Sequence, residues 1–319
     1  MYGRLISILI ASILCGCAHP GAAPLLFVSN EGDGTVSVVD LDDRAVIATI
    51  EAGTRPRGLG LSPDGTRLYV ALGTEDAIAV IDTQSFEVLE KLDAGSDPEA
   101  FAVHPQTGNL YVSNEDEGTA TALDPATGEK LAVIPVGIEP EGVACSPTGD
   151  RVLVTAESTS TLHVISVPEH EEVGVILVGA RPREAAFSSD GKFAYVTSEI
   201  ASEVARVDMT SLSIAQKANF EAENVKPKGI VLLEERGELY VTTGRANSIE
   251  VLDAETLEAR ASIGVGRRVW GLVAGPAGRM LYSADGLDNA VSVVDIEARE
   301  RLLQIPVGER PWGLVVLEP

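Results

Sequence analysis

Short runs in which apolar and polar positions alternate recur along the chain at a nearly constant spacing. One such run, Val36-Ser37-Val38-Val39, ends at Asp40, and the same position returns six more times in steps of 42, 42, 42, 42, 45 and 42 residues. The positions are Asp40, Asp82, Asp124, Ser166, Asp208, Asp253 and Asp295. Alternation with period 2 predicts β-strands, and a period in the forties predicts one four-stranded unit per repeat.

The second repeat shows the four predicted strands, over residues 56–61, 68–72, 77–82 and 86–92. The turn Ser62-Pro63-Asp64-Gly65 joins the first two, because Pro sets φ and Gly permits a positive φ. Four antiparallel strands per repeat and seven repeats predict an all-β fold, a seven-bladed β-propeller.

The two ends of the chain together supply one blade. Residues 25–51 provide three strands, and residues 311–316 provide one strand of the missing type. We therefore expect the C-terminal strand to pair with the N-terminal strands, which removes the open edges between the first and last blades. Residues 1–24 are expected to form a targeting segment and short tether, and residues 25–319 a single propeller domain.

Several segments resemble the YVTN β-propeller repeat family: Tyr111-Val112-Ser113-Asn114, Ser62-Pro63-Asp64-Gly65 and Pro140-Glu141-Gly142-Val143. The resemblance extends from Leu25 to the C-terminus. In length and repeat count the chain is similar to the exported members associated with PQQ-dependent alcohol catabolism. The resemblance implies a role in a periplasmic oxidation or transport pathway. No cofactor is identified from the residues, and PQQ and haem both remain open.

The N-terminal residues predict export. Arg4 precedes an apolar run from Leu5 to Cys15 that is too short to span a membrane as a mature helix. Processing has two alternatives. The segment Leu14-Cys15-Gly16-Cys17 resembles a bacterial lipobox, with Cys17 as the lipidated residue, and the other cut would follow Ala23. Both alternatives place the protein in the periplasm, and the first anchors it to a membrane.

The chain is strongly acidic, with a net charge of −24. Such a surface disfavours general binding to nucleic acid or to anionic lipid, so any attraction for anions must be local. We expect a monomer.

The loop that enters the innermost strand carries a repeated Pro in six of the seven repeats and Val269 in the other. The residues before and after an extended Pro should point to the same side, toward the mouth of the central channel. These positions hold eight of the 24 Lys and Arg residues. Five neighbouring blades form an expected cationic arc of Arg55, Arg57, Arg181, Arg183, Lys226, Lys228, Arg268, Trp270, Arg310 and Trp312. The other two blades form an expected acidic arc of Asp97, Glu99, Glu139 and Glu141.

Three interpretations of this rim stay open. Converging Arg side chains beside Trp rings could bind a small carboxylate or phosphate. The two arcs could instead dock on a periplasmic or membrane-bound protein of opposite charge, or they could be a solvated polar rim whose charges contribute little.

Glu184 departs from the repeat, because most repeats have Gly at that position. It would pair with a rim arginine, and it is the one candidate for a catalytic group, as a general base. No pair of histidines has the spacing of a metal site, and no metal is predicted.

These observations predict an exported, non-enzymatic binding or scaffold module that uses the cationic, Trp-bearing arc to bind an anionic ligand or partner protein. Two alternatives remain: a propeller hydrolase of the lactonase type, and a haem-binding propeller. The hydrolase would need a base and usually a metal or His at the channel mouth, and haem would need a ligand for its iron.

Overall fold

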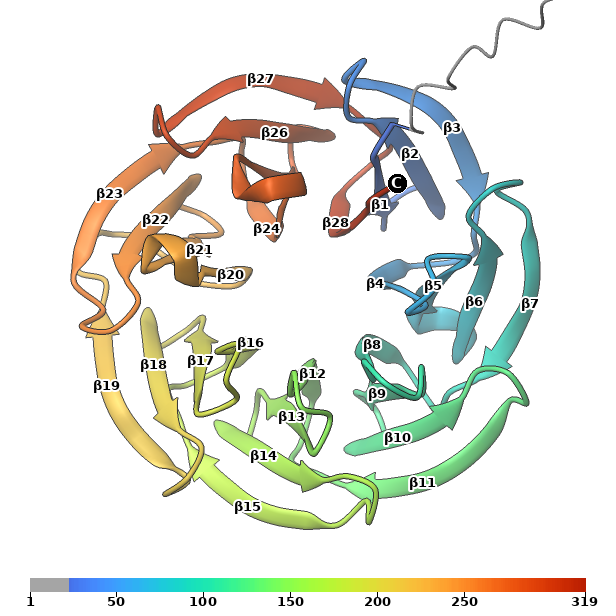
Figure 1. Cartoon of the computed structure of the whole chain (residues 1–319), viewed down its shortest axis with the longest axis horizontal. Helices are drawn as coiled ribbons and strands as arrows, with labels where there is room; N and C mark the ends of the chain where they lie inside the picture. Colours follow the sequence, from blue (N-terminus) through green and yellow to red (C-terminus); the bar gives the residue numbers. More distant parts are fainter. Residues whose placement is uncertain (1–22) are drawn as a thin grey trace, which may run out of the picture.

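Seven four-stranded antiparallel sheets surround a central axis, so that each predicted repeat forms a blade (Figure 1). The computed structural model describes residues 23–319. The expected targeting segment, including the lipidation at Cys17, lies outside the described residues except for its last two positions. Within residues 23–319, no helix is long and apolar enough to cross a membrane.

The innermost strands of the blades line the channel. They are β4 (Pro56–Leu61), β8 (Pro98–Val103), β12 (Pro140–Cys145), β16 (Pro182–Phe187), β20 (Ile230–Leu233), β24 (Val269–Ala274) and β28 (Pro311–Leu317). The second strands are β1 (Leu25–Asn30), β5 (Arg67–Leu72), β9 (Leu110–Asn114), β13 (Arg151–Ala156), β17 (Phe193–Ser198), β21 (Glu238–Thr242) and β25 (Met280–Asp285).

The outer half of each blade completes the sheet. The third strands are β2 (Thr35–Asp40), β6 (Ala77–Asp82), β10 (Thr119–Asp124), β14 (Thr161–Ser166), β18 (Glu203–Asp208), β22 (Ser248–Asp253) and β26 (Ala290–Asp295). The outermost strands are β3 (Ala45–Glu51), β7 (Val88–Asp93), β11 (Glu129–Pro135), β15 (Glu172–Leu177), β19 (Ser213–Asn219), β23 (Ala259–Gly264) and β27 (Glu300–Pro306). Three single-turn 3₁₀ helices lie in loops: η1 (Gly73–Glu75), η2 (Glu234–Arg236) and η3 (Pro276–Gly278).

The C-terminal strand closes the ring as the sequence predicts. Strand β28 pairs antiparallel with β1 in the sheet β28-β1-β2-β3, with Leu26 opposite Val316 and Val28 opposite Leu314. The first and last segments of the chain therefore share one blade, and neither leaves an unpaired inner edge.

The core lies between neighbouring blades. One cluster joins Phe27 and Val38 of the closing blade to Leu68, Val70 and Ile81 of the next, all fully buried. Alternation along the strands puts these apolar side chains on the faces that stack, which is the source of the repeated pattern. Burial of such faces gives the ring most of its stability, because the free energy scales with the apolar area removed from water.

The predicted strands of the second repeat correspond to β4–β7, with one difference. Strand β7 begins at Val88 rather than at Phe86. Phe86 has a positive φ of 60°, and its N–H donates to Asp82 O at 2.9 Å, which closes a turn. Its ring packs edge-on against Phe27 of the neighbouring blade, with centroids 6.2 Å apart.

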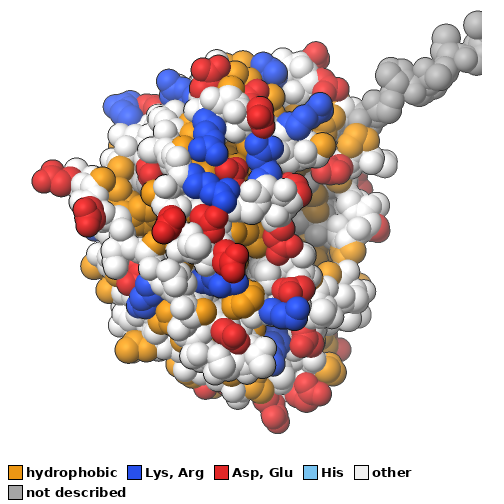
Figure 2. Space-filling model, turned by 60° about the vertical axis from the view of Figure 1, so that its left-hand side comes forward, with side chains coloured by type: hydrophobic (Ala, Val, Ile, Leu, Met, Phe, Trp, Pro, Cys, Tyr) orange, Lys and Arg blue, Asp and Glu red, His pale blue; other side chains and the backbone are white. Residues whose placement is uncertain are grey.

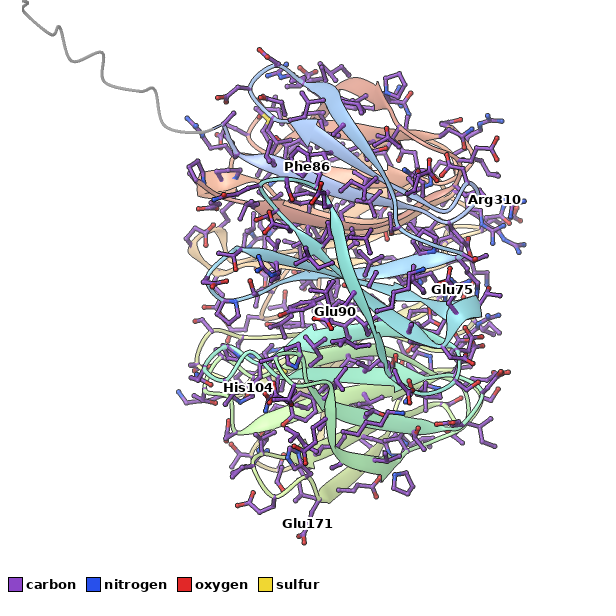
Figure 3. The ribbon with its side chains drawn as sticks, turned by 90° about the vertical axis from the view of Figure 1, so that its right-hand side faces the viewer. Glu75, Phe86, Glu90, His104, Glu171 and Arg310 are labelled. Atoms are coloured by element: carbon purple, nitrogen blue, oxygen red, sulfur yellow. The ribbon has the colours of Figure 1, made fainter. Side chains whose placement is uncertain are left out.

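The disc has two distinct faces. In Figure 3, Arg310 and Glu75 lie at one edge of the disc and His104 lies at the other. The rim residues belong to the first face, where the loops enter the inner strands. Figure 2 shows Asp and Glu side chains spread over the visible face, with several Lys and Arg side chains close together in its upper part and others below.

Candidate functional site

A left-handed turn at the start of most inner strands holds the first set of rim residues. In six blades the residue before the strand has φ between 51° and 58°: Arg55, Asp97, Glu139, Arg181, Arg268 and Arg310. The Pro that follows begins the strand in five of these blades, as an extended Pro should, but the residue before it lies in the left-handed region, which the sequence did not predict. In the blade with the three-residue insertion, β20 begins only at Ile230, so Lys226 and Lys228 lie in the preceding loop.

The carbonyl of each left-handed residue accepts a hydrogen bond from the loop between the second and third strands. The donors are the N–H groups of Glu31, Gly73, Glu115, Glu157, Glu199 and Gly286, at 2.8–3.2 Å. Four of these donors are glutamates, so the turn places their carboxylates over the rim. Sequence reasoning missed this ring of glutamates, although their spacing of 42 residues or its double was the available signal.

Hydroxyl groups on the second strands hold the second set of rim residues, which follow the Pro position. The side chains of Ser29, Ser113, Thr155, Thr197 and Thr242 donate to the backbone carbonyls of Arg57, Glu141, Arg183, Lys228 and Trp270, at 2.5–3.1 Å. Each bond crosses from one blade to the next. The repeat therefore positions the channel side chains as well as the strands.

Carboxylates surround Arg55. Its Nη2 lies 2.6 Å from Glu99 Oε1 and 3.7 Å from Glu115 Oε2, and its Nη1 contacts Asp97. The three carboxylates offer oxygens within 4.8 Å of one another, which resembles the donor set of a hard cation. Because the guanidinium already lies among them, these residues do not fit a divalent ion, whose charge the arginine would repel.

A second set of ion pairs surrounds Arg183, which is buried. Its Nη2 lies 2.7 Å from Glu141 Oε1, and its Nη1 contacts Glu157. Arg181 lies above this pair, with Nε 2.6 Å from Glu157 Oε2 and 3.3 Å from Glu199 Oε2. Arg57 also pairs with two carboxylates: its Nη2 lies 2.8 Å from Glu31 Oε1, and its Nη1 contacts Glu99.

Lys228 reaches across the channel. Its Nζ lies 2.9 Å from Glu141 Oε1, which comes from the inner strand two blades away. The same ammonium lies 4.7 Å from the ring centroid of Trp270 and 4.0 Å from that of Trp312. Two aromatic faces and one carboxylate therefore hold a single amine near the axis.

These groups line a cavity of about 120 Å³ inside the channel. Its polar lining comes from Glu141, Arg183, Glu184 and Lys228, and Trp312 forms part of its apolar wall. The volume is of the order of the roughly 150 Å³ cavity that holds benzene in a well-studied engineered core. A five- or six-membered ring is therefore of a suitable size.

Burial shifts the pKa of Glu184 strongly. Loss of hydration and the charge of Glu141 raise the pKa of its carboxyl, whereas Lys228, the N–H of Ile230 and Arg183 oppose the shift, and the resulting pKa is about 7. Glu141 behaves in the opposite way. Although burial raises its pKa, Arg183, Lys228 and Arg57 outweigh that effect and hold it at about 2. The cavity thus contains one permanently ionised carboxylate and one that can exchange a proton near neutral pH.

Three cations of the predicted cationic arc have no ion pair within residues 23–319: the half-buried Lys226 and the exposed Arg268 and Arg310. The guanidinium of Arg268 lies 4.9 Å from the Trp270 ring centroid. Gly286 makes room for that ring, because a Cβ there would lie 2.8 Å from Trp270 Cδ1.

The structure brings the predicted rim residues to one channel but does not keep their charges in separate arcs. Asp97, Glu99 and Glu141 of the expected acidic arc pair with Arg55, Arg57, Arg183 and Lys228 of the expected cationic arc. Glu139 accepts a hydrogen bond from Ser158 instead. Among the described rim residues, unpaired positive charge remains at Lys226, Arg268 and Arg310, on three consecutive blades. The interpretation of the rim as fully solvated does not apply to four of its residues, which are buried: Glu99, Glu141, Arg183 and Lys228.

The histidines of the described chain lie away from this cavity. His104 and His170 flank Tyr111, and His163 lies on β14, bonded to Glu172. Iron in a haem would need an axial ligand, for which imidazole is a common choice. The donors that line the described channel, which are carboxylates and cations, do not fit haem, and no step below depends on it.

Comparison with known proteins defines a class that this architecture resembles. The family described as "Lactonase, 7-bladed beta-propeller" matches residues 175–309, a segment that contains Glu184, Lys228, Arg268 and Trp270. The chain is therefore similar to lactonase-type seven-bladed propellers over that segment. No curated protein matches the chain.

Solved structures share the fold at low sequence identity. A candidate 6-phosphogluconolactonase from Bacteroides fragilis is 18% identical with a TM-score of 0.81, covering 93% of this chain and 99% of its own. Another from Bacteroides uniformis is 18% identical with a TM-score of 0.78, covering 93% and 100%. Dihydro-heme d1 dehydrogenase NirN is 16% identical with a TM-score of 0.68, covering 91% of this chain and 74% of its own. At these identities the likeness shows the fold alone.

These findings correct the function expected from the sequence. The prediction of a non-enzymatic binding or scaffold module is wrong, since the family match favours the lactonase alternative. A linear sequence does not show that Glu184 shares a cavity with Lys228 and Arg183.

Proposed function

We propose that the protein is a lactone hydrolase whose reaction takes place in the channel cavity. The observation that carries this proposal is the position of Glu184, a carboxyl group with a pKa of about 7 in the same small cavity as Lys228 and Arg183. A base whose pKa lies near the working pH is well suited to proton transfer. The family match over residues 175–309 supports the same assignment.

In this mechanism the ionised Glu184 accepts a proton from a water molecule in the cavity. The water oxygen attacks the lactone carbonyl carbon, and the carbonyl electron pair moves onto its oxygen. Lys228 and Arg183 supply positive charge close to the oxyanion, which lowers the energy of the tetrahedral intermediate. The intermediate collapses with cleavage of the ring C–O bond, and Glu184 returns its proton to the leaving alkoxide. The product is a hydroxy acid.

The walls of the cavity orient the substrate. The Trp312 ring and the inner-strand glycines provide an apolar surface for the lactone ring. The buried ion pairs of Arg57 and Arg183 fix the polar side chains before the substrate arrives, so little reorganisation accompanies the reaction. No metal ion is assigned a role, because the carboxylates that could bind one surround Arg55.

The test is hydrolysis of a panel of five- and six-membered lactones, and the rate is measured from the proton release at constant pH. We expect activity in the wild type and a loss of kcat by a factor of about 100 or more in Glu184→Gln, the range for removal of a general base. Glu139→Gln is the matched control, because Glu139 lies on the rim and is hydrogen-bonded to Ser158 outside the cavity lining. A wild type that hydrolyses none of the panel, or a Glu184→Gln variant with full activity, would overturn the proposal.

The setting of the enzyme belongs to the same proposal. We place it in the periplasm, anchored through a lipid on Cys17, as its N-terminal sequence predicts. Membership of the YVTN family and a link to PQQ-dependent catabolism rest on resemblance to the repeat motifs. Mass spectrometry of the mature protein tests the anchor. A chain that begins with diacylated Cys17 supports it, and a chain that begins with unmodified Pro24 contradicts it.

A further inference from the structure

Lys228 is the only lysine at its position in the seven repeats. The corresponding residues in the other repeats are Arg57, Glu99, Glu141, Arg183, Trp270 and Trp312. An arginine there would give the same charge, but a guanidinium does not lose its proton in proteins, whereas an amine can. Lysine at this one position therefore permits chemistry that the rest of the rim does not.

The surroundings of Lys228 raise the fraction of neutral amine above that of an exposed lysine, although the ammonium remains the major form at pH 7. The side chain is 4% exposed, and the rings of Trp270 and Trp312 enclose its Nζ at centroid distances of 4.7 and 4.0 Å. Burial lowers its pKa most, and Arg183 and Arg57 lower it further, so the value falls to about 8 even though Glu141 opposes the shift. Glu141 opposes the lowering of this pKa only in part, because its Oε1 also forms an ion pair with Arg183 Nη2 at 2.7 Å.

We propose that the amine of Lys228 condenses reversibly with small aldehydes that enter the channel cavity, forming an imine. Both the amine and the carboxyl of Glu184 line this cavity of about 120 Å³, so the nucleophile and a proton-transfer group lie beside one space that a small aldehyde can fill. This activity does not depend on lactone hydrolysis.

The chemistry balances with groups that the cavity holds. The lone pair of Nζ forms a bond to the aldehyde carbon, and the C=O electron pair moves to oxygen. Glu184 takes a proton from the nitrogen and gives one to the oxygen, which yields a carbinolamine. A second proton transfer releases the oxygen as water and leaves the C=N bond. No oxidant or reductant takes part, and addition of water reverses the sequence.

Cavity size and charge restrict the aldehyde. The Trp312 ring and the narrow volume favour a carbonyl compound of two to a few carbon atoms, and Arg183, which also lines the cavity, favours one with a carboxylate. Glyoxylate is the smallest probe with both features.

The chain offers a well-controlled labelling experiment, because it has only six lysines: Lys91, Lys130, Lys192, Lys217, Lys226 and Lys228. The wild-type protein is incubated with glyoxylate and sodium cyanoborohydride at pH 7, and the rate of carboxymethylation at each lysine is measured by peptide mass spectrometry. An amine with a pKa of about 8 is roughly 10% neutral at this pH, against roughly 0.04% for an ordinary lysine. Glyoxylate enters the channel cavity more slowly than it reaches an exposed amine. We therefore expect Lys228 to react only about tenfold faster than Lys226, its matched neighbour in the same loop.

Two variants separate the possible results. Lys228→Arg should lose the fast adduct and keep its fold by circular dichroism, and Lys226→Arg should retain the adduct. Glu184→Gln should slow the reaction at Lys228 without moving the site. Modification of Lys228 no faster than that of Lys226 would overturn the proposal. A protein that fails the lactone panel yet forms the fast adduct would separate this inference from the proposed function.

Discussion

At the scale of single residues, neighbouring groups of the channel differ in protonation because their partners differ. Glu141 touches Arg183 and Lys228 and stays ionised, whereas Glu184 is desolvated without an arginine bonded to its carboxylate in the described chain. The sequence suggested Glu184 as a base from its break in a glycine position. It could not show the shift in pKa, because Glu141 and Lys228, which contribute to the shift, come from the two neighbouring blades.

The shifted pKa of Glu184 makes stability depend on pH. Its folded value, about 7, lies above its ordinary value, so between pH 4.5 and 7 the folded protein binds more protons than the unfolded chain. The contribution of this group therefore favours folding at low pH and is lost as the pH rises through 7. We expect the melting temperature of the wild type, relative to that of Glu184→Gln, to fall between pH 5 and pH 8. A constant difference across that range would show that the carboxyl is not shifted.

The free cations at the mouth should act on anionic substrates. Arg268 and Arg310 are exposed, and each such charge contributes about 0.5–1 kcal/mol to an interaction with an anion. We expect Arg268→Glu combined with Arg310→Glu to raise KM for a carboxylate-bearing lactone roughly tenfold and to leave kcat nearly unchanged. The effect should shrink as salt is added. Arg301→Glu, on the exposed face of β27, is the control, and an equal rise in KM there would remove the specific role of the mouth.

At the scale of strands and loops, the same short hydrogen bonds build the blades and orient the channel. The alternating pattern predicted the strands within one or two residues, since the stacking faces repeat with period 2. The left-handed residue before each strand and the glutamate loops above it were not predicted. These contacts join backbone groups 18 residues apart in five blades and the two ends of the chain in the closing blade. Backbone groups leave no mark in side-chain periodicity.

The loop between β25 and β26 should control the position of Trp270. A methyl group at Gly286 would lie 2.8 Å from Trp270 Cδ1 and 2.9 Å from Nε1, so the ring must move. We expect Gly286→Ala to shift tryptophan emission and to slow lactone hydrolysis through loss of the contact with Lys228. Gly264→Ala is the control, because a Cβ there meets no atom within 4 Å. Unchanged emission in Gly286→Ala would contradict the described packing, and the chain has only two Trp residues to report it.

The hydroxyl bridge at Thr242 should stabilise the contact between two blades. Its Oγ1 donates to Trp270 O at 2.7 Å and accepts from the Gly229 N–H at 2.7 Å. Thr242→Val keeps the volume but leaves both backbone groups without a partner, so we expect a loss of about 1–3 kcal/mol in the free energy of unfolding. Thr210→Val, at an exposed turn, should cost much less. Equal losses in urea denaturation would show that the bridge contributes little.

At the scale of the whole molecule, ring closure makes the site possible. Lys228 and Glu141 belong to blades that are not adjacent, and they meet only because the ring brings inner strands to one axis. Seven blades and their closure could be predicted from the repeat and from the incomplete units at the two ends. The pairing of opposite charges could not, since it depends on which side chains meet across the channel.

Removal of the closing strand should disrupt the ring. Deletion of residues 311–319 would expose the edge of β1 and remove Trp312 from the cavity wall. We expect such a protein to aggregate or to unfold at a much lower temperature, because an open edge pairs with other chains. Deletion of Glu318 and Pro319 alone, which follow β28, should leave a stable monomer by size-exclusion chromatography. A stable monomer after the longer deletion would contradict the closure.

The most direct test of the account is the pH dependence of kcat/KM for the lactone that the wild type hydrolyses fastest. We predict a rate that rises with pH and levels off above an apparent pKa near 7, as Glu184 loses its proton. The rise should disappear in Glu184→Gln and persist in Glu139→Gln. A profile that is flat between pH 5 and pH 8, or one that is unchanged in Glu184→Gln, would contradict the assignment of Glu184 as the base.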